Sequence, residues 1–197
     1  MVSENALSPE HKFMAKRIDS MFKKFYQTKQ FNGTVLVAKA GKIIYKNNFG
    51  IENKKNNAPL TDSSMFQLAS ISKVITATAV LMLHERKLIN LNKDVNEYLP
   101  DFPYKNIKVK ELLSHRSGLP NYLYVLNNDL YIPEYRMSNE DMYERFVSKK
   151  PGLYYKPNRK FNYCNTNYAL LALLVEKISG KTYSQFLKDE IFTPLGM

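Results

Sequence analysis

The chain has 197 residues and a hydrophobic fraction of 44%, which is enough for a folded core and excludes a fully disordered protein. Its formal net charge is +11. Of the 29 cationic residues, 23 are Lys, and they are spread along the whole chain beside 19 Asn. Proteins that read nucleic acids depend on Arg and on clustered charge, so we interpret this charge as a solvated surface and predict no nucleic-acid partner. A single Cys excludes a disulfide framework within the chain and a zinc site built on several cysteines.

Membrane and targeting signals are also missing from the sequence. The longest apolar runs, residues 74–83 and 169–175, are much shorter than the roughly 20 residues of a membrane-spanning helix. Residues 1–10 have neither a basic region nor an apolar region, so they predict no signal peptide. Two alternatives remain: a cytoplasmic protein, or a chain whose leader was lost or lies outside these residues.

The first 62 residues predict a helix, a β-hairpin and a loop. Ser8, Pro9 and Glu10 are typical of a helix start. One apolar stripe at helical spacing follows, made of Met14, Ile18, Met21, Phe22, Phe25 and Tyr26. Residues 34–45 are β-prone on both sides of a turn at Ala40-Gly41, which predicts a hairpin. Residues 52–62 are polar and rich in Asn, so we expect a loop there.

The chain beyond Phe66 predicts mainly helices. They are expected at residues 73–88, 109–114, 165–179 and 183–192, with one more beginning at Ser138. Asp141 lies at the capping-box position of the helix that begins at Ser138, and Gly180 is expected to cap the C-terminal end of the helix at residues 165–179. Residues 90–103 predict a short helix or an irregular segment, residues 121–133 are hard to assign, and residues 149–161 predict a loop. Two strands alone make a poor sheet, which indicates that the sheet is incomplete in this chain.

A possible nucleophile occurs at Ser70, three residues before Lys73. This spacing on a helix places the amine one turn from the hydroxyl, where it can share the hydroxyl proton. The spacing alone is weak evidence, because chance predicts about 1.5 such pairs in this composition and a second one occurs at Ser20 and Lys23. Tyr-x-Asn is equally common, with three occurrences against about 1.4 expected.

The surroundings of these short patterns resemble the serine β-lactamase and penicillin-binding-protein superfamily, in its class C-like branch. Residues 66–73 (FQLASISK) are similar to the nucleophile segment of that branch, and residues 112–120 (LLSHRSGLP) to its "LLxHxSGLP" segment. Residues 161–168 (FNYCNTNY) resemble its "F-x-Y-S-N-x-x-Y" segment, and residues 192–197 (FTPLGM) its "I-F-x-P-L-G-M" turn. The resemblance covers roughly residues 13–197 in order.

The resemblance implies an α+β, β-lactamase-like fold. Residues 1–60 would form the N-terminal part of an antiparallel sheet domain, and residues 61–197 a mostly helical domain that carries both motifs. The remaining C-terminal strands of the sheet would be absent from this chain. The family's third motif, Lys-Thr-Gly or His-x-Gly, lies beyond the PLGM turn, and Lys181-Thr182 does not replace it because Tyr183 follows.

The resemblance also assigns roles to four residues. Ser70 would be the nucleophile, Lys73 would assist proton transfer, and Tyr163 would act as general base or proton relay. Asn165 would bind substrate and hydrogen-bond to Lys73, and the Ser70 backbone N–H would be one oxyanion donor. No metal or cofactor is implied.

Three residues depart from the family pattern or offer an alternative. Cys164 replaces a serine and is expected to be a small buried residue. Asn158 stands where glycine is usual, and asparagine tolerates a left-handed turn. His115 is the one histidine that could pair with Ser70 in a Ser-His-Asp arrangement, although the family uses its segment structurally.

The sequence therefore predicts a serine hydrolase that transfers an acyl group from a lactam, peptide or ester through a Ser70 acyl-enzyme. Its partner would be a small-molecule or peptide substrate. The family resemblance suggests that the protein acts in the periplasm or cell envelope. Two alternatives stay open: a catalytically inactive protein on the same scaffold that binds peptidoglycan or peptides, and a basic helical domain that binds nucleic acid. The oligomeric state is not predicted.

Overall fold

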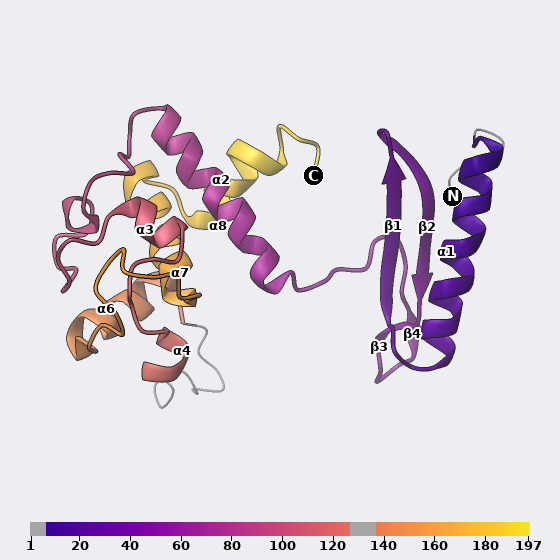
Figure 1. The fold of residues 1–197 in the computed structure, drawn as a ribbon, viewed down its shortest axis with the longest axis horizontal. Coiled ribbons are helices and arrows are strands. Elements are labelled where there is room, and N and C mark those ends of the chain that lie inside the picture. Colours follow the sequence, from indigo (N-terminus) through magenta and orange to yellow (C-terminus); the bar gives the residue numbers. More distant parts are fainter. Residues whose placement is uncertain (1–6, 127–136) are drawn as a thin grey trace. The chain divides into compact units, whose positions relative to one another are not determined.

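The computed structural model describes residues 7–126 and 137–197, which form two compact units. The first unit extends to Gln67 and the second begins at Leu68. Figure 1 shows a helix and short antiparallel strands in the first unit and a group of helices in the second. The fold class is therefore α+β, as the sequence predicts.

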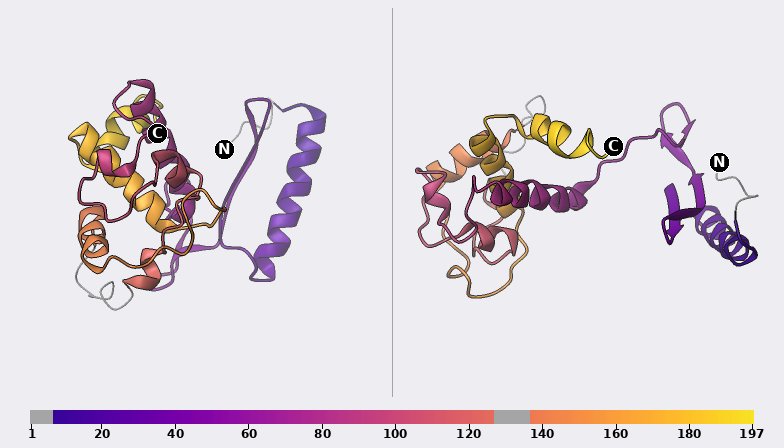
Figure 2. Two further views of the ribbon diagram at one scale, coloured as in Figure 1. Left: turned by 60° about the vertical axis from the view of Figure 1, so that its left-hand side comes forward. Right: turned by 90° about the horizontal axis from the view of Figure 1, so that it is seen from above.

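The first unit is built on one helix and one hairpin. Helix α1 (Pro9–Gln27) begins where the Ser8 hydroxyl accepts a hydrogen bond from the His11 N–H at 3.3 Å. Strand β1 (Gly33–Lys39) pairs antiparallel with β2 (Lys42–Phe49), with a register shift after Val37. Ala40 and Gly41 both have positive φ, 49° and 73°, as a tight hairpin turn requires. Helix α1 lies along the hairpin in both views of Figure 2.

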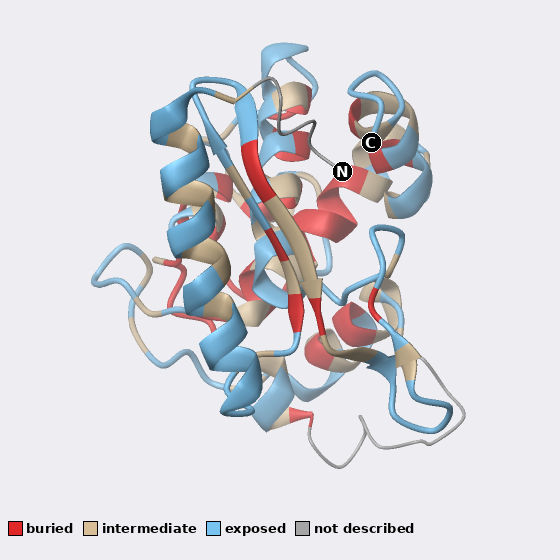
Figure 3. Ribbon diagram, turned by 90° about the vertical axis from the view of Figure 1, so that its right-hand side faces the viewer, coloured by how far each residue is buried: buried red, intermediate tan, exposed pale blue. Residues whose placement is uncertain are grey.

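The apolar stripe predicted on α1 is only partly used in this packing. Ile18 and Phe22 pack against the small core formed by Val35, Tyr45 and Phe49. Other members of the stripe are exposed: Met21 by 45%, Phe25 by 37% and Tyr26 by 46%. The pale blue that covers most of α1 in Figure 3 shows the same result. A hairpin of two strands covers only a narrow strip of the helix, whereas the sequence pattern assumes a wider sheet.

A second, shorter strand pair replaces part of the predicted loop at residues 52–62. Strands β3 (Ile51–Asn53) and β4 (Ala58–Pro59) pair antiparallel. The side chain of Asn32 fixes the start of β3, because its amide group accepts from the Ile51 N–H at 2.8 Å and donates to the Ile51 carbonyl at 3.0 Å. This contact between distant residues is not visible in local sequence patterns.

The second unit packs its helices around α7 (Asn165–Ser179). Residues 170–175 of α7 are all buried, as expected for a helix that is apolar all round. Five other helices contact α7: α2 (Ser72–Glu85), α3 (Val109–Leu113), α4 (Tyr122–Val125), α6 (Asn139–Lys149) and α8 (Tyr183–Leu187). Short turns complete the unit: η2 (Ala69–Ile71), η3 (Val95–Glu97) and the π-helix η4 (Lys188–Phe192).

Helix ends in the second unit follow mostly from local chemistry. Ser138 and Asp141 form the predicted capping box of α6, and Gly180 ends α7 with a φ of 69°. Helix α2 ends at Glu85, before the predicted Leu88, because Lys87 adopts a left-handed conformation and Leu88 bonds back to the Leu83 carbonyl. The predicted helix 183–192 is α8 followed by η4.

Two further sequence predictions are limited by the extent of the structure. Of the segment 121–133, only residues 121–126 are described, and α4 occupies four of them. Within the described ranges, no helix is both long enough and apolar enough to cross a membrane.

Candidate active site

Ser70 lies in the short turn that leads into α2. Ala69, directly before it, has a φ of 48°, a left-handed conformation that costs an alanine roughly 1–2 kcal/mol. The Ser72 hydroxyl donates to the Ala69 carbonyl at 2.6 Å and holds this turn. The turn places Ser70 on η2 and Lys73 in the first turn of α2, on an exposed part of the second unit.

Three of the four sequence-predicted site residues come together at this point. The Tyr163 Oη lies 2.7 Å from the Ser70 Oγ, and the Lys73 Nζ donates to the same Ser70 Oγ at 3.2 Å. The Lys73 Nζ also lies 5.0 Å from the centre of the Tyr163 ring. Two groups able to accept or return a proton therefore contact one serine hydroxyl.

The electrostatics of the site make the Tyr163 phenol easier to ionise than a free tyrosine. The pKa of Tyr163 is lowered from 10.0, first because Lys73 stabilises the phenolate and second because Ser70 hydrogen-bonds to it. The neighbouring Tyr168 shows the opposite effect, since burial raises the pKa of its phenol. Tyr163 is thus better suited than Tyr168 to accept a proton.

Asn165 does not make the contact that the family resemblance implies. It is the first residue of α7 and is half-buried. Within residues 7–126 and 137–197, no hydrogen bond joins its side chain to Lys73. Asn165 follows Tyr163 by two positions in the chain, and its role in binding substrate stays a prediction.

A buried polar cluster lies beneath the site. The His115 Nδ1 accepts from the Cys164 backbone N–H and pairs with the Asn167 Nδ2, both at 3.2 Å. The Ser117 hydroxyl donates to the Asn167 Oδ1 at 2.6 Å. The Nδ1 of His115 is thus engaged by Cys164 and Asn167, and no hydrogen bond joins His115 to Ser70 in the described part of the chain. This agrees with the structural use of the segment that the resemblance implies, and the contacts with Cys164 and Asn167 are not visible in local sequence patterns.

Other chemistry at the site is disfavoured. Burial raises the pKa of the Cys164 thiol, so this side chain is a poor nucleophile and packs as a small buried group. Where the structure describes the chain, no group of three or more His, Cys, Asp or Glu side chains is arranged to hold a metal ion.

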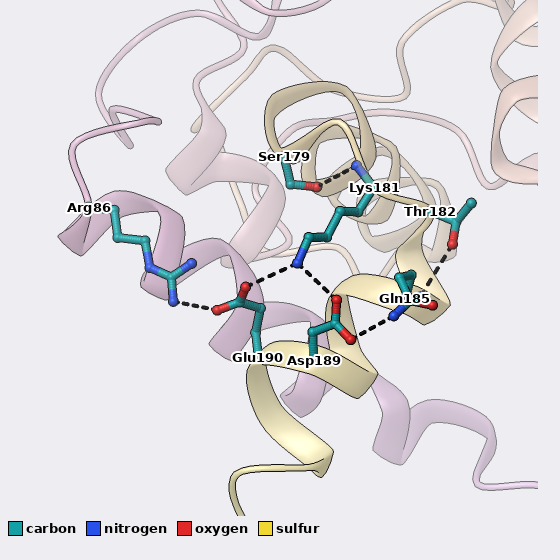
Figure 4. A network of polar contacts seen from close by, with 7 residues as sticks. All are labelled: Arg86, Ser179, Lys181, Thr182, Gln185, Asp189 and Glu190. Carbon is teal, nitrogen blue, oxygen red and sulfur yellow. Dashed lines mark hydrogen bonds and ion pairs between the residues drawn. The ribbon is translucent and has the colours of Figure 1, made fainter.

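The side chains of Lys181 and Thr182 make their polar contacts with residues of α8 and η4. Figure 4 shows the Lys181 ammonium between Asp189 and Glu190, at 2.9 and 3.4 Å, with Glu190 also paired to Arg86. The Thr182 hydroxyl accepts from the Gln185 N–H and caps α8. Lys181 thus ties the start of α8 to η4, and the Arg86–Glu190 pair ties η4 to the end of α2, so Lys181 and Thr182 are engaged in structural contacts.

The predicted tolerance of asparagine at residue 158 is found in the structure. Asn158 has a φ of 60°, in the left-handed region. Its side-chain oxygen accepts from the Arg116 guanidinium at 3.0 Å, and its N–H donates to the Arg116 carbonyl at 2.7 Å. The loop that precedes Tyr163 is therefore tied to the segment that carries His115.

Comparison with known proteins identifies the family of the chain. A family model described as Beta-lactamase matches residues 18–197. The chain belongs to the beta-lactamase family. This membership confirms the resemblance and the β-lactamase-like fold stated from the sequence.

Three relatives illustrate the range of the family. Penicillin-binding protein 4* of Bacillus subtilis is 37% identical over 92% of this chain and 40% of its own length. Teichoic acid D-alanine hydrolase of Staphylococcus aureus is 32% identical over 91% of this chain and 42% of its own. The solved D-amino acid amidase of Ochrobactrum anthropi is 26% identical with a TM-score of 0.72, covering 87% of this chain and 47% of that one. The chain spans about 40% of the length of these curated relatives.

Proposed function

We propose that Ser70 is the nucleophile of a serine hydrolase that works through an acyl-enzyme. The observation that carries this proposal is the convergence of Lys73 and Tyr163 on the Ser70 Oγ, at 3.2 and 2.7 Å. Family membership supports it, because the relatives include proteins named as a hydrolase and an amidase.

The reaction would proceed in two steps. The Ser70 Oγ attacks the substrate carbonyl carbon while its proton passes to the Tyr163 phenolate or the Lys73 amine. The bond between the carbonyl carbon and the leaving group then breaks, and the group that accepted the proton returns it to the leaving oxygen or nitrogen. Water next attacks the ester formed with Ser70 and gives up a proton to the same base, which passes it to the Ser70 oxygen as the acid is released.

The substrate class we propose is an ester, amide or lactam of a D-amino acid. Two of the relatives carry names that specify D-alanine or D-amino acids. The net charge of +11 favours a polyanionic carrier of such an ester, such as a teichoic acid, since charge attraction raises the encounter rate. We accordingly propose the cell envelope as its location.

A binding protein without turnover on the same scaffold is the second candidate. It would hold a ligand at the same exposed Ser70 but would form no bond to the hydroxyl. It predicts noncovalent binding of ligands with no bond to Ser70.

Covalent labelling tests the two candidates. The full chain is incubated with a fluorescent penicillin and, in parallel, with a D-alanyl ester, and the adduct is located by mass spectrometry of peptides. A hydrolase gives an adduct on Ser70 and releases D-alanine, whereas binding without an adduct on Ser70 overturns the proposed chemistry.

The chain offers a matched control for this test. Ser70→Ala is expected to abolish labelling. Ser20→Ala removes the serine of the second Ser-x-x-Lys pair, which lies within α1, and is expected to leave labelling unchanged. Equal labelling of the Ser70→Ala variant and the unaltered chain would assign the adduct to another residue.

A further inference from the structure

The ring of His115 packs directly against Tyr163. Their ring centres are 4.6 Å apart with the planes inclined by 34°, and Tyr168 lies on the same imidazole at 5.0 Å. Phe161 meets the ring edge-on at 5.9 Å. His115 is only 8% exposed, while Tyr163 is 47% exposed. The phenol that contacts Ser70 therefore has one buried, rigid neighbour on a face of its ring.

The backbone of His115 is unusual for a residue with a ring. It has a φ of 55° directly after the C-cap Ser114 of α3, and its N–H and that of Arg116 bond back to the Leu112 and Glu111 carbonyls. Glycine is favoured at this position of the Schellman motif.

Among the described residues, three other non-glycine residues at helix ends have a similar left-handed backbone. They are Lys29, Lys87 and Lys150, and all three are exposed. His115 differs because its side chain is buried, so the helix end itself does not account for the imidazole.

The hydrogen bonds of the imidazole fix its orientation. Both the Cys164 N–H and the Asn167 amide point at Nδ1, so Nδ1 carries the lone pair and a neutral ring has its proton on Nε2. Burial, followed by the charge of Lys73, lowers the pKa of His115, and the hydrogen bond with the Cys164 backbone opposes this shift without reversing it. The titratable groups that face the ring are Lys73, Tyr163, Tyr168 and Cys164.

We propose that His115 is a positioning residue that holds the Tyr163 phenol against Ser70. The neutral ring forms the surface on which Tyr163 rests, and its Nδ1 anchors the backbone one residue beyond that tyrosine. This inference rests on the proposed function of Tyr163, and it assigns the histidine no contact with substrate.

Two substitutions separate the two contributions of the ring. His115→Asn keeps a residue type that tolerates the left-handed backbone and offers an oxygen near the place of Nδ1, but it removes the stacking surface. His115→Phe keeps the stacking surface and removes the acceptor of the Cys164 N–H. His84→Asn is the matched control, because His84 is an exposed histidine in the same unit whose Nδ1 contacts the Ile89 carbonyl.

The measurement is the titration of the Tyr163 phenol in the full chain, followed by NMR of tyrosine labelled with ¹³C at Cζ and assigned with Tyr163→Phe. In the unaltered chain, Tyr163 is expected to titrate below 10.0. His115→Asn is expected to move this pKa upward, toward its ordinary value, and to lower the denaturant midpoint because a cavity replaces part of the buried ring. His115→Phe is expected to lower the midpoint while the phenol pKa stays low, and His84→Asn to change neither.

An unchanged Tyr163 pKa in His115→Asn would overturn the proposal. So would a Tyr163 pKa that changes in parallel with the denaturant midpoint in both His115→Asn and His115→Phe, because His115 would then be merely structural. This readout needs no turnover, so it is independent of the labelling of Ser70. Where labelling by a penicillin occurs, His115→Asn is expected to slow it about 10- to 100-fold, and to add little when Tyr163→Phe is already present.

Discussion

At the scale of single residues, the two Ser-x-x-Lys pairs of this chain differ in the groups that surround the serine hydroxyl. Ser20 is an exposed residue within α1, and its lysine, Lys23, pairs with Asp19 at 2.7 Å. Ser70 instead lies in the turn that leads into α2, directly after a residue with a left-handed backbone. Its hydroxyl is hydrogen-bonded to both the Lys73 amine and the Tyr163 phenol. The spacing is the same in the two pairs, and the surroundings decide which hydroxyl can lose its proton.

The first prediction concerns the pH dependence of Ser70 acylation. Because the pKa of Tyr163 is lowered, its phenolate forms below pH 10.0, and the acylation rate is expected to rise with pH through that ionisation and then level off. Tyr163→Phe is expected to remove this limb and to slow acylation by about 10²–10⁴-fold. Stopped-flow measurements with a fluorescent penicillin from pH 6 to pH 10 check this.

Tyr124→Phe is the control for this measurement, since Tyr124 is 74% exposed. Its profile is expected to match that of the unaltered chain. A rate that is independent of pH in the unaltered chain, or a Tyr163→Phe variant that keeps the same limb, would contradict the role of the phenol as base.

At the scale of elements, one loop fixes the start of α7. The Thr166 hydroxyl donates to the Pro120 carbonyl at 2.7 Å and accepts from the Tyr122 N–H at 2.8 Å. The Asn167 side chain joins Ser117 to His115. These are buried polar groups satisfied by one another, so each depends on the others. The segment 115–122 thereby sets the position of Tyr163, just before α7.

The second prediction concerns this buried cluster. Asn167→Ala leaves the Ser117 hydroxyl and the His115 Nδ1 without one partner each, and it is expected to lower the free energy of unfolding by about 1–3 kcal/mol. Urea unfolding followed by circular dichroism measures the change. Asn139→Ala, in the first turn of α6, is the comparison and is expected to change stability by less than about 0.5 kcal/mol. Equal effects of the two substitutions would show that the cluster contributes little.

At the scale of the whole molecule, the two units differ greatly in the size of their cores. In the described part of the first unit, the buried cluster consists of Val35, Tyr45 and Phe49 with partly buried neighbours, and Ile44 and Leu60 are buried outside this cluster. The core of the second unit extends over α2, α3, α6, α7 and α8. A small core offsets less of the conformational entropy lost on folding, so the two units are expected to differ in local stability.

The third prediction follows from this difference. Amide hydrogens of β1 and β2 are expected to exchange with solvent faster than those of residues 170–175 in α7, although both sets are hydrogen-bonded. Hydrogen exchange followed by mass spectrometry on the full chain, resolved to peptides, measures both. Peptides from α1 serve as a third set and are expected to follow the hairpin on which α1 packs. Slower exchange in the hairpin than in α7 would contradict this ordering.

Local chemistry determined much of this protein from the sequence alone. The starts of α1 and α6, the Ala40-Gly41 turn and the glycine that ends α7 all depend on residues close together in the chain, so short-range rules predict them. The motif segments around Ser70 and Tyr163 were likewise recognisable, because their order along the chain carries the family resemblance.

Only the tertiary structure decided the contacts between distant residues. It brought Tyr163 to Ser70 across 93 positions and placed His115 beneath the phenol rather than beside the serine. It also left much of the α1 stripe exposed and Asn165 without its expected bond to Lys73. The physical reason is that periodicity states which side chains can be buried, whereas the surface that is available to cover them, and the partner that meets each polar atom, depend on how the whole chain packs.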